Sequence, residues 1–173
     1  LAGGKGTRMS PLTKAVNKQL LPLYDKPLIF YPLSVLMLAG IKDILIIVNK
    51  GQLNQFKKIL PEKNNLGIKI SYKEQQKPNG LPEAFLIGEK FIGKENVALI
   101  LGDNFFYGQS LTNTLKRNIN LKKGARIFLH PVKNPNLYGV AYLNSNKKVI
   151  KLIEKPKKSK SNFAVTGLYL FDN

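Results

Sequence analysis

The residues best suited to chemistry lie at the beginning of this sequence, in the stretch LAGGKGTR from Leu1 to Arg8. Two apolar residues run into closely spaced glycines and then an arginine, which is typical of a buried strand that breaks into a tight turn. Glycines let backbone N–H groups turn toward an anion, and a guanidinium offers several planar hydrogen bonds to phosphoryl oxygens. The spacing matches neither GxGxxG nor GxxxxGK[ST], so from this stretch alone an ordinary glycine turn is an equally good interpretation.

A second candidate residue, Asp103, follows the apolar run VALIL at 97–101 after a single glycine. Its carboxylate is expected at the carboxyl end of a buried strand. One such carboxylate suits Mg²⁺, which completes its shell with water and substrate phosphates. The adjacent Asn104 leaves an Asx turn or a helix cap as the alternative. Taken together with the glycine turn and Arg8, Asp103 favours a nucleotide-phosphate site with magnesium.

Alternating strands and helices must position these residues. The hydrophobic patterns predict helices at 32–40, 52–60, 80–91 and 111–119, and strands at 44–48, 68–72, 97–101, 125–132, 139–143, 149–153 and 163–171. Residues 10–26 are expected to form an ordered loop with a short extended piece. This order predicts an α/β fold, a Rossmann-like three-layer sandwich with a mostly parallel mixed sheet and helices on both faces. Ligands of such sheets bind beyond the carboxyl ends of the strands, where the glycine turn, residues 74–80 and residues 102–104 are expected.

Composition limits the class of protein. A length of 173 residues and a hydrophobic share of 43% are typical of one globular domain, here residues 1–173. The sequence has no cysteine and one histidine, so a thiolate metal site, a disulfide and a multi-histidine metal cluster are all excluded. The absence of a long apolar run and of a signal-like start indicates a cytoplasmic protein with no membrane partner.

The net charge of +18 invites a nucleic-acid interpretation. Only three of the 28 basic residues are arginine, and the lysines are scattered along the chain. Nucleic-acid surfaces usually combine arginine with aromatic residues, so a solvated lysine-rich surface without a nucleic-acid partner is the better interpretation.

The two ends of the sequence predict that this chain is part of a longer protein. A buried strand with only Leu1 and Ala2 before its turn is too short, and the chain ends at Asn173 directly after a strand-like run. We therefore expect a fragment that lacks the start of the first strand and a C-terminal portion.

The chain resembles a known family along its whole length, from Leu1 to Asn173. The resemblance rests on the blocks LAGGKGTR, NKQLLPLYDKP, YPLSVLMLAGI, QKPNGLPEAFLIGEKFIG, LGDNFFYG, YGV and EKPKKSKSNFAVTGLY. Together these are similar to the glucose-1-phosphate thymidylyltransferases, also called dTDP-glucose pyrophosphorylases, which are sugar nucleotidyltransferases. The resemblance implies a sheet of the nucleotide-diphospho-sugar transferase type. It also implies that a missing C-terminal part supplies a second metal-binding aspartate and the contacts of a homo-oligomer.

The resemblance also implies roles for individual residues. The implied catalytic residues are Arg8, Lys18 and Lys155, and the implied magnesium ligand is Asp103. The nucleotide would be bound by Leu1, Gly3, Gly4, Gly6, Thr7, Gln75 and Gly80, with Gln75 on the thymine edge and Gly80 allowing the base to approach the backbone. The sugar phosphate would be bound by Asn104, Tyr138, Gly139, Glu154, Lys155 and the stretch from Val165 to Gly167.

The implied reaction transfers a thymidylyl group from dTTP to glucose 1-phosphate with Mg²⁺, giving dTDP-glucose and pyrophosphate. A sugar phosphate is mostly dianionic at neutral pH, so no general base is needed, and a chain with one histidine and no cysteine can still be catalytic. Three different functions stay open beside it: a UTP-using sugar-1-phosphate nucleotidyltransferase, a truncated nucleotide-binding module without turnover, and a basic polyanion-binding protein.

Overall fold

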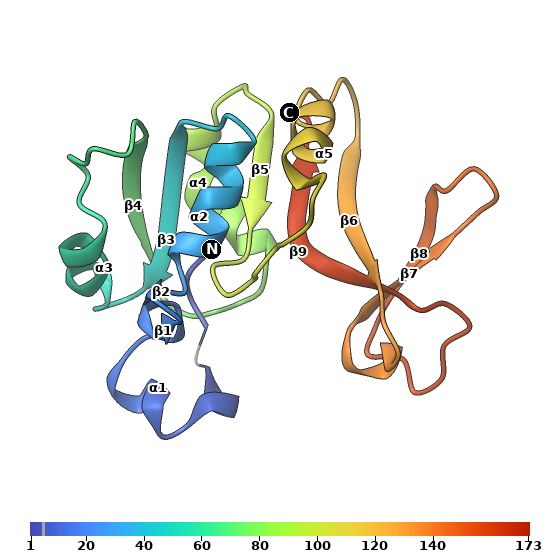
Figure 1. The fold of residues 1–173 in the computed structure, drawn as a ribbon, viewed down its shortest axis with the longest axis horizontal. Coiled ribbons are helices and arrows are strands. Elements are labelled where there is room, and N and C mark those ends of the chain that lie inside the picture. Colours follow the sequence, from blue (N-terminus) through green and yellow to red (C-terminus); the bar gives the residue numbers. More distant parts are fainter. Residues whose placement is uncertain (5) are drawn as a thin grey trace.

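The computed structural model describes residues 1–4 and 6–173, and the side chain of Arg8 lies outside this description. Figure 1 shows two groups of strands, one formed by Asp43–Asn49 and Lys69–Gln75 and the other running from Val97–Ile100 to the hairpin of residues 139–154. The helices are α1 (Leu12–Ala15), α2 (Phe30–Leu38), α3 (Leu53–Ile59), α4 (Pro82–Ile92) and α5 (Leu111–Asn118), with 3-10 turns η1 (Thr7–Met9), η2 (Lys18–Leu20) and η3 (Pro135–Leu137). The strands are β1 (Pro22–Leu23), β2 (Lys26–Pro27), β3 (Asp43–Asn49), β4 (Lys69–Gln75), β5 (Val97–Ile100), β6 (Ala125–Pro131), β7 (Gly139–Leu143), β8 (Val149–Glu154) and β9 (Phe163–Phe171).

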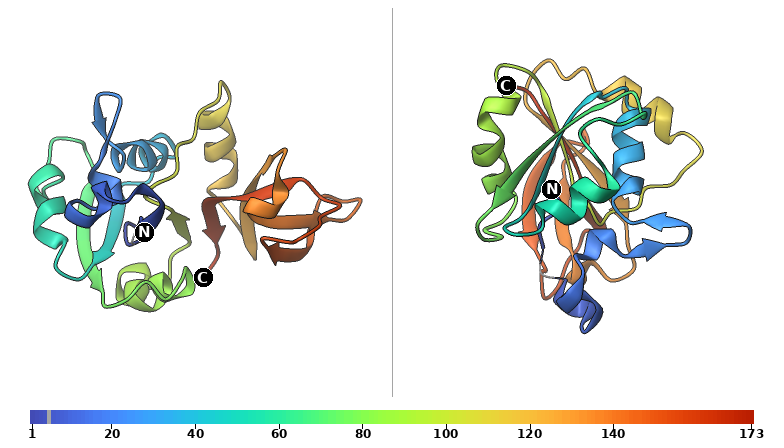
Figure 2. Two further views of the ribbon diagram at one scale, coloured as in Figure 1. Left: turned by 90° about the horizontal axis from the view of Figure 1, so that it is seen from below. Right: turned by 90° about the vertical axis from the view of Figure 1, so that its left-hand side faces the viewer.

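The parallel strands β3 and β4 lie between helices. Ile44, Ile46 and Val48 belong to the core that includes the apolar side chains of α2, whereas Ile47 packs with Ala84 of α4 on the other face. The right-hand view of Figure 2 shows α4 on one side of the strands and α2 on the other. The continuous apolar run of β3 is therefore buried on both faces, as its sequence predicts.

The remaining long strands form an antiparallel sheet in the order β5-β9-β7-β8, with β6 also paired to β9. The end of β9 pairs with β5, from Ile100↔Leu168 to Val97↔Phe171. Its beginning pairs with β7, where Val140 lies opposite Ala164, and β6 pairs with both its beginning and its end. Figure 1 shows β9 curving from the neighbourhood of α5 to the β7–β8 hairpin. One strand thus connects the helix-covered part of the molecule to a mostly β part.

The first two residues join the two groups of strands. Ala2 forms a parallel bridge with Val48 of β3. The Leu1 nitrogen donates to the Ile100 carbonyl oxygen at 2.7 Å, and the Gly102 N–H donates to the Leu1 carbonyl oxygen at 2.8 Å. A cleft of about 860 Å³, lined by both apolar and charged side chains, lies between β3 and β5 beside Leu1. The glycine turn therefore starts from a point held on both sides by strands.

The predicted α/β class with a mixed sheet is confirmed, but the sheet is not mostly parallel. Among the named strands, only β3 and β4 pair in parallel, and the other pairs are antiparallel. The physical reason lies after β5, where β6, β7, β8 and β9 follow one another without an intervening α-helix, and strands joined by short connections pair antiparallel. The region 10–26, expected to be a loop, also contains α1 and the β1–β2 hairpin.

The helices of the described residues are short relative to the thickness of a bilayer. None of them combines the length and the apolar character needed to cross one.

Candidate active site

The glycine turn follows directly from the strand-held residues Leu1 and Ala2. Gly6 adopts a left-handed conformation with φ +58° and leads into η1. Its carbonyl oxygen accepts a hydrogen bond from Thr13 Oγ1 at 2.8 Å. A Cβ at Gly6 would lie 2.8 Å from Thr13 Cγ2, so both the backbone conformation and the close contact require glycine here.

Gln75 is packed against the other side of the turn. It is only 2% exposed, and its Nε2 donates to the Gly3 carbonyl oxygen and to Asn49 Oδ1, both at 2.9 Å. A Cβ at Gly3 would lie 2.0 Å from Gln75 Nε2. Gly3 is therefore required because a buried side chain occupies the space beside it. The predicted residues Gly3 and Gln75 are brought together, with Asn49 as a third partner that the sequence reasoning missed.

Side-chain amides surround the start of the turn. The buried polar residues Asn17, Gln19 and Gln75 are all of this type. Asn17 Nδ2 donates to the Ala2 carbonyl oxygen at 3.3 Å and to Gln52 Oε1, and Asn17 Oδ1 accepts from the Gln19 N–H at 2.9 Å. Gln19 Oε1 is buried and has no hydrogen-bond partner among the described residues. These amides hold the backbone of the turn with neutral groups, which do not offset the positive charge that a phosphate site needs.

Lys18 and Asp103 form an ion pair at the rim of this turn. Lys18 Nζ donates to Asp103 Oδ2 at 2.7 Å, and the two side chains are 30% and 31% exposed. Gly102 permits this arrangement, because a Cβ there would lie 3.1 Å from both Gln19 Cγ and the Leu1 carbonyl oxygen. The predicted lysine and aspartate are thus adjacent in space, although 85 residues separate them in the chain.

The donor set around Asp103 can be compared with what magnesium requires. In the described part of the chain, no group of three or more His, Cys, Asp or Glu side chains could hold a metal. Asp103 offers a partly exposed carboxylate, one oxygen of which holds Lys18. Mg²⁺ is usually bound by one or two carboxylates together with substrate phosphates and water. Asp103 therefore fits a magnesium ion that is also held by nucleotide phosphates, and does not form a protein-only metal site.

Asn104 connects the Asp103 loop to β9. A Cβ at Gly167 would lie 2.1 Å from Asn104 Nδ2, so the asparagine side chain lies directly on the backbone of this strand. The Leu101 N–H also donates to the Gly167 carbonyl oxygen at 2.8 Å. The predicted residues Asn104 and Gly167 are in contact, and they link the proposed magnesium ligand to the strand that carries Val165.

The other predicted sugar-phosphate residues gather where β7, β8 and β9 meet. Gly139 is paired with Glu154, and a Cβ at Gly139 would lie 3.0 Å from Glu154 Oε2 and 3.9 Å from Val165 Cβ. Lys155 follows in a left-handed conformation, φ +42°, and its N–H donates to the Tyr138 carbonyl oxygen at 3.0 Å. Gly139, Glu154, Val165, Lys155 and Tyr138 therefore form one group.

The Lys155 ammonium group lies beside Glu154. Its Nζ is 3.8 Å from Glu154 Oε1, and both side chains are well exposed, at 59% and 74%.

The remaining predicted nucleotide-binding residues lie at the surface. Thr7, Gly4 and Gly80 are exposed, and Gly80 has φ +104°. The side chain of the predicted catalytic Arg8 lies outside the described residues. Its part in the site, and the convergence of Arg8, Asp103 and Lys155 on one string of phosphates, stay predictions.

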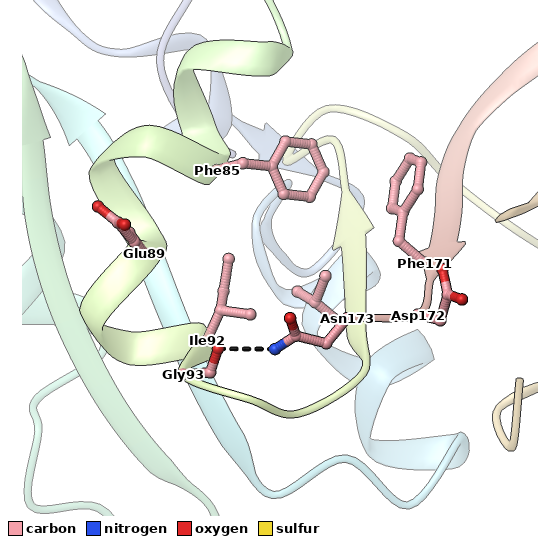
Figure 3. A pocket seen from close by; sticks show the side chains of 8 residues that line it. Phe85, Glu89, Ile92, Gly93, Phe171, Asp172 and Asn173 are labelled. Atoms are coloured by element: carbon pink, nitrogen blue, oxygen red, sulfur yellow. Dashed lines mark hydrogen bonds between the residues drawn. The ribbon is translucent and has the colours of Figure 1, made fainter. Parts of the chain in front are cut away.

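A separate hollow lies between α4 and the end of β9. Figure 3 shows Phe85, Ile92 and Phe171 around it, and Asn173 Nδ2 donating to the Gly93 carbonyl oxygen. None of the predicted site residues whose side chains the structure describes lines this hollow. The apolar hollow and the polar groups of the candidate site are thus in different places.

Known proteins are similar to this chain in sequence. The family described as nucleotidyl transferase matches residues 1–173. A glucose-1-phosphate thymidylyltransferase from Neisseria meningitidis serogroup A is 55% identical over 173 residues, and one from Mycobacterium tuberculosis is 49% identical over the same length. Each match covers 100% of this chain but 60% of the relative, so the chain spans about 60% of the length of these relatives.

Solved structures agree with these matches. A candidate glucose-1-phosphate thymidylyltransferase from Bacillus anthracis superposes with a TM-score of 0.91 at 37% identity, covering 99% of this chain and 69% of that chain. A UDP-glucose pyrophosphorylase complexed with UDP-glucose superposes with a TM-score of 0.78 at 28% identity, covering 98% of this chain and 73% of that chain.

Proposed function

This chain belongs to the nucleotidyl transferase family, and from that premise we propose that it forms the substrate-binding core of a glucose-1-phosphate thymidylyltransferase. The enzyme would join dTTP to glucose 1-phosphate and release pyrophosphate. The observation that carries this proposal is the Lys18–Asp103 ion pair beside the glycine turn, linked through Asn104 and Gly167 to the group around Gly139 and Glu154. A phosphate-binding rim and a sugar-binding group are what such a transfer needs.

The proposed chemistry is a displacement at phosphorus. A phosphate oxygen of glucose 1-phosphate attacks the α-phosphorus of dTTP, and the bond from the α-phosphorus to the oxygen bridging to the β-phosphate breaks. Pyrophosphate leaves with that electron pair. Because the sugar phosphate is already mostly dianionic at neutral pH, no protein side chain has to remove a proton. The task of the protein is to place the two anions in line and to offset their repulsion.

Each residue is proposed to perform the part of this task that its position in the site allows. Lys18 supplies a positive charge at the rim of the glycine turn, and the backbone of Gly3, Gly4, Gly6 and Thr7 is proposed to supply N–H donors for the triphosphate. Two phosphates about 4 Å apart repel by roughly 1 kcal/mol per pair of charges in water, and by several times more in a drier cleft. Asp103 would hold Mg²⁺, which neutralises phosphoryl charge when bound. Glu154 is proposed to accept hydrogen bonds from sugar hydroxyls, and Lys155 to bind the sugar phosphate.

A competition assay tests the thymidylyl assignment. Equal concentrations of dTTP and UTP are offered with glucose 1-phosphate and Mg²⁺, and the two nucleotide sugars are quantified. We expect dTDP-glucose to dominate, by about 10- to 200-fold if one methyl group decides the choice. The structural similarity to UDP-glucose pyrophosphorylase makes a UTP-using enzyme the second candidate, and an excess of UDP-glucose would establish it in place of the first.

Two further experiments distinguish a transferase from a binding module without turnover and from a polyanion-binding protein. Product formation by the 173-residue chain is compared with that of a full-length relative, because binding of dTTP without turnover would indicate a binding module only. A polyanion-binding protein would bind DNA of any sequence with a steep salt dependence. We expect no such binding at physiological salt.

A further inference from the structure

Asn49 and Gln75 end neighbouring parallel strands and lie directly opposite each other in register. The Gln75 amide carries two N–H groups, and both are used within the protein, one by the Gly3 carbonyl oxygen and one by Asn49 Oδ1. The only atom of this amide that can still serve a ligand is therefore Oε1, which accepts hydrogen bonds and cannot donate them.

The orientation of the Gln75 amide is determined by its neighbours. The Gly3 carbonyl oxygen can only accept, so turning the amide over would place two acceptor oxygens against each other. Asn49 Oδ1 holds the second N–H in the same sense, and Asn49 Nδ2 in turn lies 3.5 Å from the Gly4 carbonyl oxygen. The Gly3 carbonyl oxygen thus accepts one N–H of Gln75, and Asn49 Oδ1 accepts the other, so neither N–H is available to a ligand.

We propose that Asn49 is a positioning residue that presents Gln75 as a pure acceptor and so selects bases with an N–H at ring position 3. This inference rests on the proposed function and on the position that the family resemblance implies for Gln75, at the thymine edge. Thymine and uracil carry that N–H, whereas cytosine has a lone pair at the same position and would face the Gln75 oxygen with repulsion. Asn49 does not touch the nucleotide in this scheme; it acts through Gln75.

The test uses two nucleotides that both lack the thymine methyl group. Binding of dUTP and dCTP to the 173-residue chain is measured by calorimetry, with dTTP as the reference ligand. We expect the wild-type chain to bind dUTP at least about tenfold more tightly than dCTP, as a lost hydrogen bond in a buried site predicts. In Asn49→Ala, Gly3 still holds one Gln75 N–H, but the N–H that Asn49 Oδ1 accepted is released and can donate to the ring nitrogen of cytosine, so the ratio should fall toward one.

Matched variants distinguish positioning from general damage. Asn49→Asp keeps an acceptor oxygen for Gln75 and should retain the wild-type ratio even if the added charge weakens both nucleotides. Asn54→Ala, an exposed asparagine on α3, should leave both affinities unchanged. If Asn49→Ala fails to fold, as judged by circular dichroism, Asn49→Leu of similar size replaces it.

Two results would overturn the inference while leaving the proposed function intact. One is a wild-type chain that binds dTTP but does not discriminate between dUTP and dCTP. The other is an Asn49→Ala chain with the wild-type ratio. A folded wild-type chain that binds no dTTP at all would remove the proposed function, and the role of Asn49 with it.

Discussion

At the scale of single residues, Lys18 and Asp103 are expected to contribute little to stability and much to function. Their ion pair is short, at 2.7 Å, but each side chain is about a third exposed, at 30% and 31%. Water screens a pair at this depth, so its contribution to the free energy of unfolding is about 1 kcal/mol or less. The same charges facing a triphosphate would matter far more, because phosphoryl charge develops there during the reaction.

Asp103→Asn should therefore abolish function and spare the fold. We expect the rate of pyrophosphate release to fall by about 10²- to 10³-fold or more, since the variant loses the carboxylate proposed to hold Mg²⁺. In calorimetry, the increase in dTTP affinity on adding Mg²⁺ should disappear as well. Thermal unfolding should change little. Normal turnover by this variant would show that Asp103 is not the metal ligand.

Gly3 and Gly4 provide a matched pair for the glycine turn. Gly3→Ala places a methyl group 2.0 Å from Gln75 Nε2, whereas at Gly4 no described residue other than its chain neighbours lies within 4 Å of the corresponding position. We expect Gly3→Ala to cost about 1–3 kcal/mol in the free energy of unfolding and to weaken dTTP binding, because Gln75 must move. Gly4→Ala should be close to neutral in urea titrations. Equal effects of the two substitutions would contradict the packing described for Gln75.

At the scale of elements, the connection between η2 and the start of the glycine turn is made by buried amides. Asn17 joins the Gln19 N–H, the Ala2 carbonyl oxygen and Gln52 through one side chain. These groups lie far apart in the sequence but meet beneath the turn. The turn is thus supported from two directions, by strands through Leu1 and Ala2 and by the η2 segment through Asn17.

Asn17→Ala tests this support. The variant leaves the buried Gln19 N–H and its other partners without hydrogen bonds, which should lower the free energy of unfolding by about 1–3 kcal/mol. Urea denaturation followed by circular dichroism measures the change, with Asn54→Ala as the exposed control. A loss no larger than that of the control would mean that water replaces Asn17 without cost.

At the scale of the whole molecule, the first two residues join the two groups of strands. The Leu1 nitrogen donates to the Ile100 carbonyl oxygen of β5 at 2.7 Å, and Ala2 forms a parallel bridge with Val48 of β3. The glycine turn is therefore anchored to both groups of strands at once.

The expected single domain and homo-oligomer stay predictions at this scale. The chain spans about 60% of the length of its relatives, and no comparison bears on its assembly.

The amino-acid sequence by itself determined most of the elements and several members of the site. Apolar runs, helix periodicity and proline or glycine punctuation act within a few residues, so β3, α4, β7 and β9 lie where the patterns predict them. For the same local reason, Gly6 and Asp103 could be recognised as a special backbone position and a carboxylate after a strand.

Only the tertiary structure decided which of these residues meet. The Lys18–Asp103 pair, the Asn104 side chain on Gly167 and the Asn49–Gln75 amide pair depend on strand order and register. Strand order and register are not encoded in the local spacing of residues, because the sequence around a carboxylate or an amide does not show which strand will lie beside it. The antiparallel pairing of β9 with both β5 and β7, which brings the two groups of site residues to one strand, was beyond local patterns for the same reason.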